Sequence, residues 1–489
     1  MASKPSRLFG RDSEWRELTE FASSPRLGAT LGLVYGRRRQ GKTLLLELLA
    51  RQTGGFLFAA TQQTDAQNLA DLGAAYATFR GLRQPVLFAT WRDALDELLR
   101  LGTEIPVPVV IDEFPYLSAV TPALPSYLQQ ALSPLSFAKE STRTRLILCG
   151  SALTTMSQLL CGSAPLRGRA TLELVVRPFG FREAAGFWGL DHDLDRAFQV
   201  NALVGGTPAY LEMCGGSGPA GAEDLAAWAA RRLLNPASAM FREGSLLLRE
   251  EPSISDPTSY AATLAAIAGG HCRRSEIAAA LGRPSSALGH LLSGLQDIGL
   301  IARGDDALRE KRSVFHIAEP IIRLHHLLIA RHEPELVAGR ALRVWSANAD
   351  TINSRILGPH FEDLARTWCF EHASPATLGG SAAQVRPTEI ACREHKHGHE
   401  LDVVVIESPA YAADRITAIG EAKATSSPMD LPHLERLEHL RGLLPSARVS
   451  GIPKLLLFAR SGFTPALANL AAARADLELI DMNRLYLGE

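Results

Sequence analysis

GRRRQGKT, residues 36–43, is the stretch of this 489-residue chain that decides its fold. It matches the pattern G-x-x-x-x-G-K-[ST], in which glycines let the backbone curl until successive amides point at phosphate oxygens. The apolar stretch LGLVY (31–35) precedes it, and the sequence predicts a leucine-rich helix from about Thr43 to Arg51. A helix that opens from such a loop adds the positive end of its dipole. The sequence therefore predicts the phosphate-binding loop of a P-loop NTPase.

The pattern assigns a task to each part of the loop. Lys42 is expected to reach the β- and γ-phosphates, and the Thr43 hydroxyl to be a ligand of Mg²⁺. Only seven of the 51 basic residues are lysines, so a lysine at this position is an unusual choice. We expect ATP and Mg²⁺ as cofactors. The residues expected to bind them here are Gly36, Arg37, Arg38, Arg39, Gln40, Gly41, Lys42, Thr43 and Leu44, the three arginines being solvated or next to phosphate rather than catalytic.

Further apolar runs predict the remaining strands of a sheet. They are FLFAA (56–60), VPVVI (107–111), RLILC (145–149) and LELVV (171–175). Amphipathic helical stretches separate most of them, and each run is almost entirely apolar, which is typical of a parallel sheet that is covered on both faces. The fold class expected for this part is α/β.

Polar residues at two strand ends complete the predicted site. Asp112 is expected to hold Mg²⁺ through water, and Glu113 to polarise the attacking water. Such a pair of carboxylates is common after strands of α/β proteins and is a weak signal alone. Together with the phosphate-binding loop upstream, it indicates a nucleotide site. Ser151 is expected near the γ-phosphate. Arg167 or Arg169 is expected to be an arginine finger, supplied in trans within a homo-oligomer, and a solvated side chain is an equal alternative for each.

Composition limits the classes of protein that need to be considered. Hydrophobic residues make up 46% and charged residues 21% of the chain, as in soluble globular proteins, and no apolar run reaches the ~20 residues that cross a bilayer. The first residues, MASKPSRLFGRDSEW, contain no apolar core of a targeting signal. Six cysteines occur without Cys-x-x-Cys spacing, which indicates reduced thiols in a cytoplasmic protein and excludes a zinc ribbon. The net charge of −1 does not by itself indicate a nucleic-acid partner.

Pattern changes along the chain predict five parts. They are an ATPase core (1–177), an alanine-rich helical lid (178–255), a winged helix-turn-helix (256–330), a helical connector (331–359) and a second α/β domain (360–489). The expected recognition helix, SSALGHLLSGLQDIG (285–299), contains no Lys or Arg. Since phosphate contacts supply much of the affinity for DNA, a structural role is favoured over DNA reading, with only Arg283, Ser285, Ser286 and His290 able to meet DNA.

The order of the motifs resembles a known family. LFGRDSEWRELTEF, VYGRRRQGKT, VVIDEFPYL, LILCGSALTTM, PLRGR and VGGTPAYL are similar to motifs of the archaeal-type ATPases within the AAA-related and STAND P-loop NTPases. The resemblance covers roughly residues 7–330. It implies that Phe9, Gly10 and Arg11 lie near the adenine, and that Gly206-Thr207-Pro208 is a lid motif close to the nucleotide. A simple helix stop explains the same Gly-Thr-Pro triplet.

Three charged residues on two predicted strands suggest a second site. Asp402 lies on HELDVVVIE, and Glu421 and Lys423 lie on AIGEAKA, two residues apart and therefore on one side of the strand. Two acids can bind Mg²⁺, a lysine can orient the water that attacks a phosphodiester, and Glu362 on the preceding helix can complete the metal shell. The arrangement looks like the restriction-endonuclease-like fold with its PD-(D/E)xK motif. The triplet Glu394-His395-Lys396 also matches E-x-K, in the wrong order relative to Asp402.

Three histidines beside Glu400 invite a metal interpretation. His395, His397 and His399 alternate in the sequence, but a polar hairpin tip around Gly398 explains them as well and is the preferred interpretation.

Together these features predict an ATP-dependent switch that carries a nuclease-like domain acting on DNA with Mg²⁺. The alternative is a signalling or scaffold ATPase whose last domain recognises a partner or nucleic acid without cleaving it. A winged-helix transcription regulator is disfavoured by the neutral recognition helix.

Overall fold

The structure is a computed structural model that describes residues 3–219, 223–309, 312–392, 395–411 and 413–489. The chain forms two compact units. The amino-terminal unit comprises Met1–Pro178, Thr207–Ala209 and Glu251–Ser253. The carboxy-terminal unit comprises Phe179–Gly206, Tyr210–Glu250 and Ile254–Glu489.

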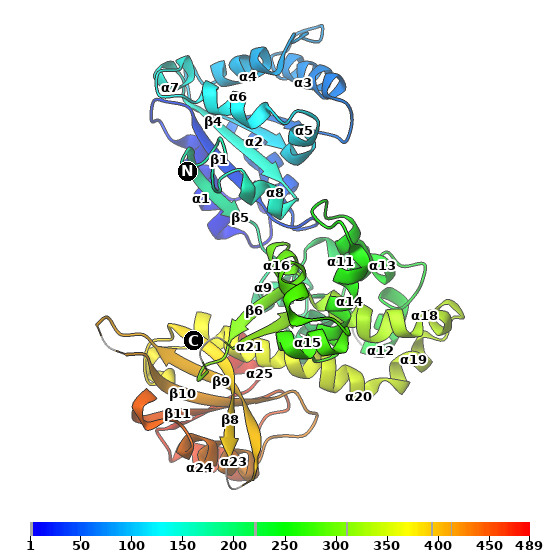
Figure 1. Cartoon of the computed structure of the whole chain (residues 1–489), viewed down its shortest axis with the longest axis vertical. Helices are drawn as coiled ribbons and strands as arrows, with labels where there is room; N and C mark the ends of the chain where they lie inside the picture. The colour runs from blue at the N-terminus through cyan, green and yellow to red at the C-terminus, as the bar shows by residue number, and fades with distance from the viewer. Residues whose placement is uncertain (1–2, 220–222, 310–311, 393–394, 412) are drawn as a thin grey trace. The chain divides into compact units, whose positions relative to one another are not determined.

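A five-stranded sheet forms the centre of the amino-terminal unit (Figure 1). Its strand order is β2-β3-β4-β1-β5, and every neighbouring pair is parallel. The strands are β1 (Thr30–Tyr35), β2 (Phe56–Ala59), β3 (Val107–Asp112), β4 (Thr144–Gly150) and β5 (Ala170–Val175). They coincide with the five apolar runs to within a few residues, so the predicted parallel α/β sheet is confirmed.

Helices cover both faces of this sheet. They are α1 (Asp12–Ser23), α2 (Lys42–Thr53), α3 (Asp65–Phe79), α4 (Trp91–Arg100), α5 (Phe114–Val120), α6 (Leu124–Ala131), α7 (Phe137–Ser141) and α8 (Leu153–Gln158). On β3, Val109 and Ile111 belong to the core formed with α3 to α6, whereas Val110 belongs to the core formed with α1 and α2. Side chains alternate between the faces of a strand, so a strand buried on both sides is apolar throughout.

Helices dominate the first half of the carboxy-terminal unit. They are α9 (Phe181–Phe187), α10 (Leu194–Val204), α11 (Ala209–Met213), α12 (Leu225–Arg232), α13 (Met240–Arg249), α14 (Pro257–Ala268), α15 (Arg274–Ala280), η1 (Ser285–Leu288) and α16 (Gly289–Asp297). An antiparallel pair, β6 (Ile301–Asp305) and β7 (Ser313–Ile317), follows α16. The elements from α14 to β7 thus occur in the order expected of a winged helix-turn-helix.

A run of helices connects this region to the last sheet. It consists of α17 (Pro320–Leu324), η2 (His325–Ile329), α18 (Ala330–Val337), α19 (Ala341–Ala347), α20 (Ala349–Thr351), η3 (Ile352–Leu357), α21 (Gly358–Glu371) and α22 (Pro375–Leu378). Pro334 lies inside α18, and His332 just before it has non-helical backbone angles, as expected where a proline interrupts a helix.

The second five-stranded sheet has the order β12-β11-β10-β9-β8. Its strands are β8 (Gln384–Cys392), β9 (His397–Glu407), β10 (Arg415–Lys423), β11 (Val449–Ala459) and β12 (Leu477–Ile480). The helices between and after these strands are α23 (Leu431–Gly442), η4 (Ser446–Arg448), α24 (Pro465–Ala472) and α25 (Met482–Leu487). The strands β8, β9 and β10 are antiparallel to one another, and β10, β11 and β12 are parallel. The strand β12 was not expected from the sequence, and with four residues, LELI, it is among the shortest strands of the structure.

Two observations bear on the predictions from composition. Within the described residues, every helix is too short or too polar to span a bilayer. All six cysteines are free thiols, as the sequence predicts.

Candidate functional site

The loop GRRRQGKT connects β1 to α2 at the carboxyl end of the parallel strands. Gly41 has a φ of 82°, a left-handed conformation that favours glycine, and it precedes the first residue of α2. At Gly36 a Cβ would lie 2.2 Å from the carbonyl oxygen of Val176, so only glycine fits there. The two glycines therefore have the backbone tasks that the sequence pattern assigns to them.

Lys42 points back into the curve of the loop. Its Nζ donates hydrogen bonds to the carbonyl oxygens of Gly36 (2.7 Å) and Arg37 (2.8 Å), and the residue is only 5% exposed. Burial lowers the pKa of the Lys42 ammonium, and the negative charges of Glu113 and Asp112 oppose that effect. A buried cation whose hydrogen bonds go to neutral carbonyl groups is well placed to exchange them for an anionic ligand.

The strand ends bring the other predicted residues to this loop. The Thr43 hydroxyl donates to the Asp112 carboxylate (2.8 Å), and the Ser151 hydroxyl donates to Glu113 (2.9 Å). Asp112 also accepts a bond from the Glu113 amide (2.9 Å), and Glu113 has a φ of 51°. Since β3 and β4 are neighbours in the sheet, four predicted residues from three segments form one polar cluster.

Other predicted loop residues surround this cluster. Arg38 donates to the hydroxyl of Tyr116 (2.8 Å), a residue of α5 that sequence reasoning did not single out. Gln40 is buried, and its carbonyl oxygen accepts a bond from Arg11 (3.1 Å). Leu44 is 43% exposed on the first turn of α2.

Two segments implied by the resemblance also lie at the loop. Arg11 contacts it through Gln40, as described above. The short segment Thr207–Ala209 belongs to the amino-terminal unit, and the amide of Ala209, which follows Pro208, donates to the carbonyl oxygen of Arg39 (3.3 Å). The structure thus places both segments next to the phosphate-binding loop.

The two arginines of PLRGR contact backbone carbonyl groups. Arg169 donates to the carbonyl oxygen of Leu132 (2.9 Å), and Arg167 donates to that of Gly162 (2.7 Å). A role for either towards a neighbouring subunit stays a prediction.

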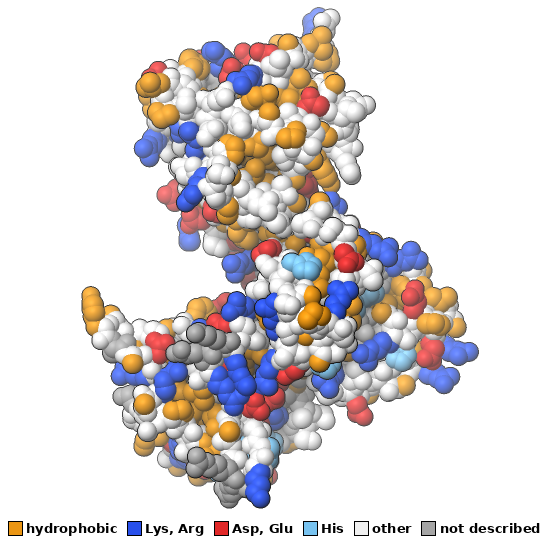
Figure 2. Space-filling view, viewed as in Figure 1, with side chains coloured by type: hydrophobic (Ala, Val, Ile, Leu, Met, Phe, Trp, Pro, Cys, Tyr) orange, Lys and Arg blue, Asp and Glu red, His pale blue; other side chains and the backbone are white. Residues whose placement is uncertain are grey.

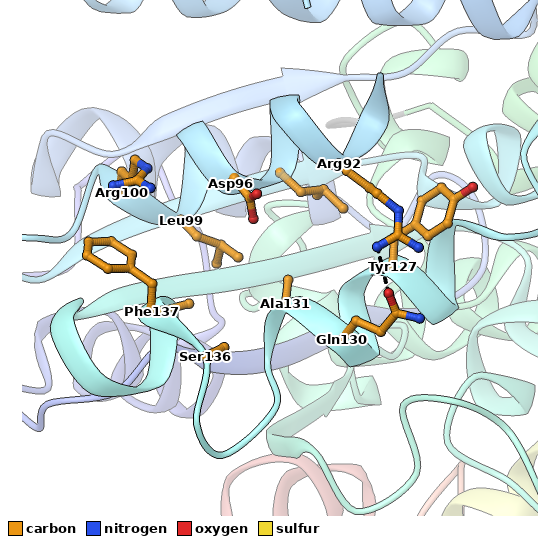
Figure 3. Close-up of a pocket in the computed structure, with 11 residues that line it drawn as sticks. Arg92, Asp96, Leu99, Arg100, Tyr127, Gln130, Ala131, Ser136 and Phe137 are labelled. Carbon is orange, nitrogen blue, oxygen red and sulfur yellow. Dashed lines mark hydrogen bonds between the residues drawn. The ribbon is translucent and has the colours of Figure 1, made fainter. Parts of the chain in front are cut away.

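A pocket of about 330 Å³ lies elsewhere in this unit, between α4, α6 and α7 (Figure 3). Arg92 lies over the ring of Tyr127, 4.3 Å from its centroid, and donates to Gln130 (2.6 Å). Every residue that lines this pocket differs from the predicted site residues. We do not assign this pocket as the nucleotide site, because the charged groups suited to a nucleotide lie at the phosphate-binding loop.

The second cluster of predicted residues is in the carboxy-terminal unit. Asp402 on β9 accepts a hydrogen bond from the amide of Ala422 on β10 (2.9 Å). Glu421 on β10 is 3% exposed, and its carboxylate lies 2.6 Å from the ammonium of Lys423. The strand pairing thus brings Asp402, Glu421 and Lys423 together, as expected from their positions.

Glu362 on α21 interacts with the same cluster through the charge of Asp402. Burial, and next the charge of Asp402, raises the pKa of Glu362 to about 8. Burial and the charge of Glu421 raise the pKa of Asp402 to about 6. Burial lowers the pKa of Lys423, but the charges of Glu421 and Asp402 outweigh it and leave that pKa raised. Three carboxyl groups thus share a site of low solvent exposure, an arrangement that a cation stabilises.

Two arginines contact this cluster and were missed from the sequence. Arg436 on α23 forms an ion pair with Glu421, and Arg366 on α21 donates to the carbonyl oxygen of Asp402 (2.7 Å). In a chain so rich in arginine, no signal in the sequence distinguishes these two from solvated arginines. Glu394, part of the competing E-x-K triplet, lies outside the described residues.

Polar residues at the start of the predicted recognition helix form hydrogen bonds with other residues of the same region. Arg283 donates to the hydroxyl of Ser259 on α14 (2.9 Å), and the carbonyl oxygens of Ser285 and Ser286 accept bonds from Arg274. On the face drawn in Figure 2, basic and acidic side chains are interspersed over both units. These contacts are consistent with a structural role for this region.

Comparisons with known proteins give distant similarities. No protein-family model matches the chain. The uncharacterized protein MJECL04 of Methanocaldococcus jannaschii is 24% identical over 345 residues, which are 69% of this chain and 72% of that protein. The Walker-type ATPase PABY2304 of Pyrococcus abyssi has a TM-score of 0.49 and 21% identity, covering 66% of this chain and 97% of that one. The ORC2 protein of Aeropyrum pernix, in ADPNP–ADP complexes, has a TM-score of 0.43 and 16% identity, covering 71% and 97%.

Proposed function

We propose that the chain binds and hydrolyses ATP, and that the nucleotide switches its activity. The observation that carries this proposal is the cluster at the loop: Lys42 held inside the curve of GRRRQGKT, with Thr43 bonded to Asp112 and Glu113 bonded to Ser151. This cluster combines a phosphate cradle, a pair of oxygen ligands and a carboxylate that can orient water.

Each residue has a definite task in this proposal. The loop amides and the amino-terminal end of α2 bind the phosphates, and Lys42 exchanges its two carbonyl partners for phosphate oxygens. The Thr43 hydroxyl and Asp112 are adjacent oxygen ligands of the kind that Mg²⁺ prefers, and they would hold that ion directly and through water. The ion supplies charge neutralisation at the phosphates. Glu113 accepts a proton from the attacking water, and Ser151 positions Glu113.

Calorimetric titration with a non-hydrolysable ATP analogue and Mg²⁺ tests the binding half of this proposal. Wild-type protein is expected to bind one nucleotide per chain. Lys42→Ala is expected to weaken binding by about 100-fold or more, because a desolvated ammonium-phosphate contact is lost. Arg51→Ala, an exposed change at the other end of α2, is the matched control and is expected to bind like wild type. Binding unaffected by Lys42→Ala would contradict the proposal.

A second activity is favoured by the cluster at Asp402, Glu421, Lys423 and Glu362. We propose that the carboxy-terminal unit cleaves DNA with Mg²⁺, and that ATP controls this cleavage. The carboxylates would hold the ion, which polarises a phosphodiester, and the Lys423 ammonium would orient the attacking water. The order α21-β8-β9-β10-α23-β11, with the acids on β9 and β10, supports a restriction-endonuclease-like assignment.

Incubation of the protein with plasmid and linear DNA tests the second activity. Cleavage with Mg²⁺ or Mn²⁺, lost in Asp402→Asn, is the expected result. Intact DNA under all these conditions, with and without ATP, would contradict it. In that case the alternative holds, namely a signalling or scaffold ATPase whose last unit recognises a partner without cutting. ATP binding would be unaffected by that outcome.

A further inference from the structure

One cysteine and three histidines converge at the tip of the β8–β9 hairpin. Cys392 ends β8, His395 lies in the turn, His399 lies near the start of β9, and His439 lies on α23. One side-chain ligand atom from each of them lies within 4.8 Å of all the others. The residues come from two segments, C-x2-H-x3-H and a helix forty positions further on (399 to 439), so they meet only through the fold.

Three of the separations within this cluster are close to those between ligands of one metal ion. The Cys392 Sγ lies 3.3 Å from Nδ1 of His395 and 3.4 Å from Nε2 of His439, and the ring nitrogens of His395 and His399 lie 3.1 Å apart. Tetrahedral zinc, with Zn–N near 2.0–2.1 Å and Zn–S near 2.3 Å, requires ligand atoms about 3.3–3.6 Å apart. These three pairs lie within about 0.3 Å of that requirement, and every other pair lies within 4.8 Å.

The orientation of the rings agrees with a common target. The His395 ring lies at 84° to that of His399 and at 74° to that of His439, with centroids 5.0 and 5.2 Å away. The rings therefore meet edge to face and do not stack, and a ring nitrogen of His399 lies next to one of His395. The backbone amide of His395 also donates to the Cys392 sulfur, 3.5 Å away, as outer-shell donors do to metal-binding sulfurs.

We propose that Cys392, His395, His399 and His439 bind one Zn²⁺ ion. One sulfur and three imidazole nitrogens are ligands that suit zinc, and four protein ligands close the shell, which is typical of a structural site. The ion joins the β8–β9 hairpin to α23, the helix whose Arg436 pairs with Glu421 and donates to the carbonyl oxygen of Glu400 (3.1 Å). The site is separate from the carboxylate cluster and does not depend on the activity proposed for it.

The proposal revises the interpretation of the alternating histidines. A polar hairpin tip accounts for His397, whose ring nitrogen bonds the carbonyl oxygen of His395 (2.9 Å). His395 and His399 instead share a cluster with Cys392 and His439, which the sequence argument did not connect with them. The cysteine lies three residues before His395, and this short spacing was the signal that could have revealed it.

Elemental analysis of the full chain, purified without a histidine tag, tests this proposal. Wild-type protein is expected to retain about one zinc per chain after incubation with ZnCl₂ and desalting. Cys392→Ser and His439→Asn are each expected to lose most of it. Cys161→Ser and His192→Ala replace an exposed cysteine and an exposed histidine elsewhere and are expected to retain it. Absence of zinc from wild type, or its full retention in both cluster variants, would overturn the proposal.

Cobalt substitution in wild-type protein provides a readout that does not depend on how the variants fold. Co²⁺ bound by one thiolate and three imidazoles is expected to give the intense visible absorption of a tetrahedral site, together with a sulfur-to-cobalt charge-transfer band. Stoichiometric addition of Zn²⁺ is expected to abolish both. A weak octahedral spectrum without the charge-transfer band would overturn the assignment of Cys392 as a ligand.

Discussion

The two polar clusters of this chain hold their key lysine in opposite ways. Lys42 in the amino-terminal unit bonds to two neutral carbonyl oxygens, and the carboxylates of Asp112 and Glu113 bond to hydroxyl groups. Lys423 in the carboxy-terminal unit is paired with Glu421, and Glu421 is paired also with Arg436. The first cluster keeps its cation available to an anion, whereas the second has its cations partly neutralised by an acid.

This difference separates what each cluster needs in order to act. The first needs only the ligand, because bonds from the Lys42 ammonium to anionic phosphate oxygens are stronger than its bonds to neutral carbonyl oxygens. The second has buried carboxyl groups with raised pKa values at Glu362 and Asp402, and a metal ion is the partner that would stabilise their charged forms. We therefore expect the first cluster to bind its nucleotide without another partner, and the second cluster to need a bound metal ion.

The largest expected effect comes from breaking the second cluster at its lysine. Lys423→Ala is expected to reduce Mg²⁺-dependent DNA cleavage by about 100-fold or more, because the group that orients the water is lost. Gel assays of plasmid cleavage measure this. Lys454→Ala, which removes an ion pair with Glu478 in the same unit, is the matched control and is expected to keep cleavage. Equal cleavage by Lys423→Ala and wild type would remove this lysine from the site.

The next effect separates binding from hydrolysis in the first cluster. Glu113→Gln is expected to lower ATP turnover by about 100-fold while leaving ATP affinity within a few-fold, because the amide keeps its shape but cannot accept a proton. Phosphate release and nucleotide titration on the same preparation measure the two quantities. A parallel loss of affinity would show that Glu113 serves binding instead.

A smaller effect is expected from the ligand pair of the first cluster. Thr43→Val removes the hydroxyl that bonds Asp112 and is expected to raise the Mg²⁺ concentration needed for half-maximal turnover by about 10-fold. Titration of turnover with Mg²⁺ at fixed ATP measures the shift. An unchanged Mg²⁺ requirement would mean that Thr43 is not a ligand.

The last effect concerns stability, not catalysis, and its pH dependence in the second cluster. The pKa of Glu362 is raised to about 8 in the folded chain, so its favourable contribution is complete below its unfolded pKa near 4.5 and is lost as the pH rises towards 8. Glu362→Gln is therefore expected to stabilise metal-free protein by roughly 1–3 kcal/mol at pH 8, with little change near pH 4.5. Denaturant unfolding at the two pH values measures this, and a destabilised variant at pH 8 would contradict it.

The sequence predicted the parallel sheet well because its signals are local. The strands β1, β3 and β4 are buried on both faces and mostly apolar, and the glycines of the loop are required by its backbone geometry. For the same reason the positions of Lys42, Thr43, Asp112 and Glu113 followed from the pattern. The antiparallel hairpin likewise brought Asp402 opposite Glu421 once the strands were recognised.

Contacts between distant segments could not be predicted in this way. The pairing of Arg436 with Glu421, and the meeting of His439 with Cys392, depend on how α23 packs against the second sheet. Neither the helix pattern around Arg436 nor the spacing to His439 specifies that packing. The bond from Ala209 to the phosphate-binding loop likewise joins residues about 170 positions apart (39 to 209).

ATP turnover by wild type, Lys42→Ala and Glu113→Gln, each with and without DNA, tests the central claim most directly. The account predicts turnover by wild type that DNA stimulates and that both substitutions reduce by about 100-fold or more, with Arg51→Ala behaving like wild type. Turnover that is indifferent to DNA would leave the ATPase but break its link to the second cluster. Absence of turnover in wild type with Mg²⁺ and DNA, or turnover that survives Lys42→Ala, would contradict the claim that this loop hydrolyses ATP.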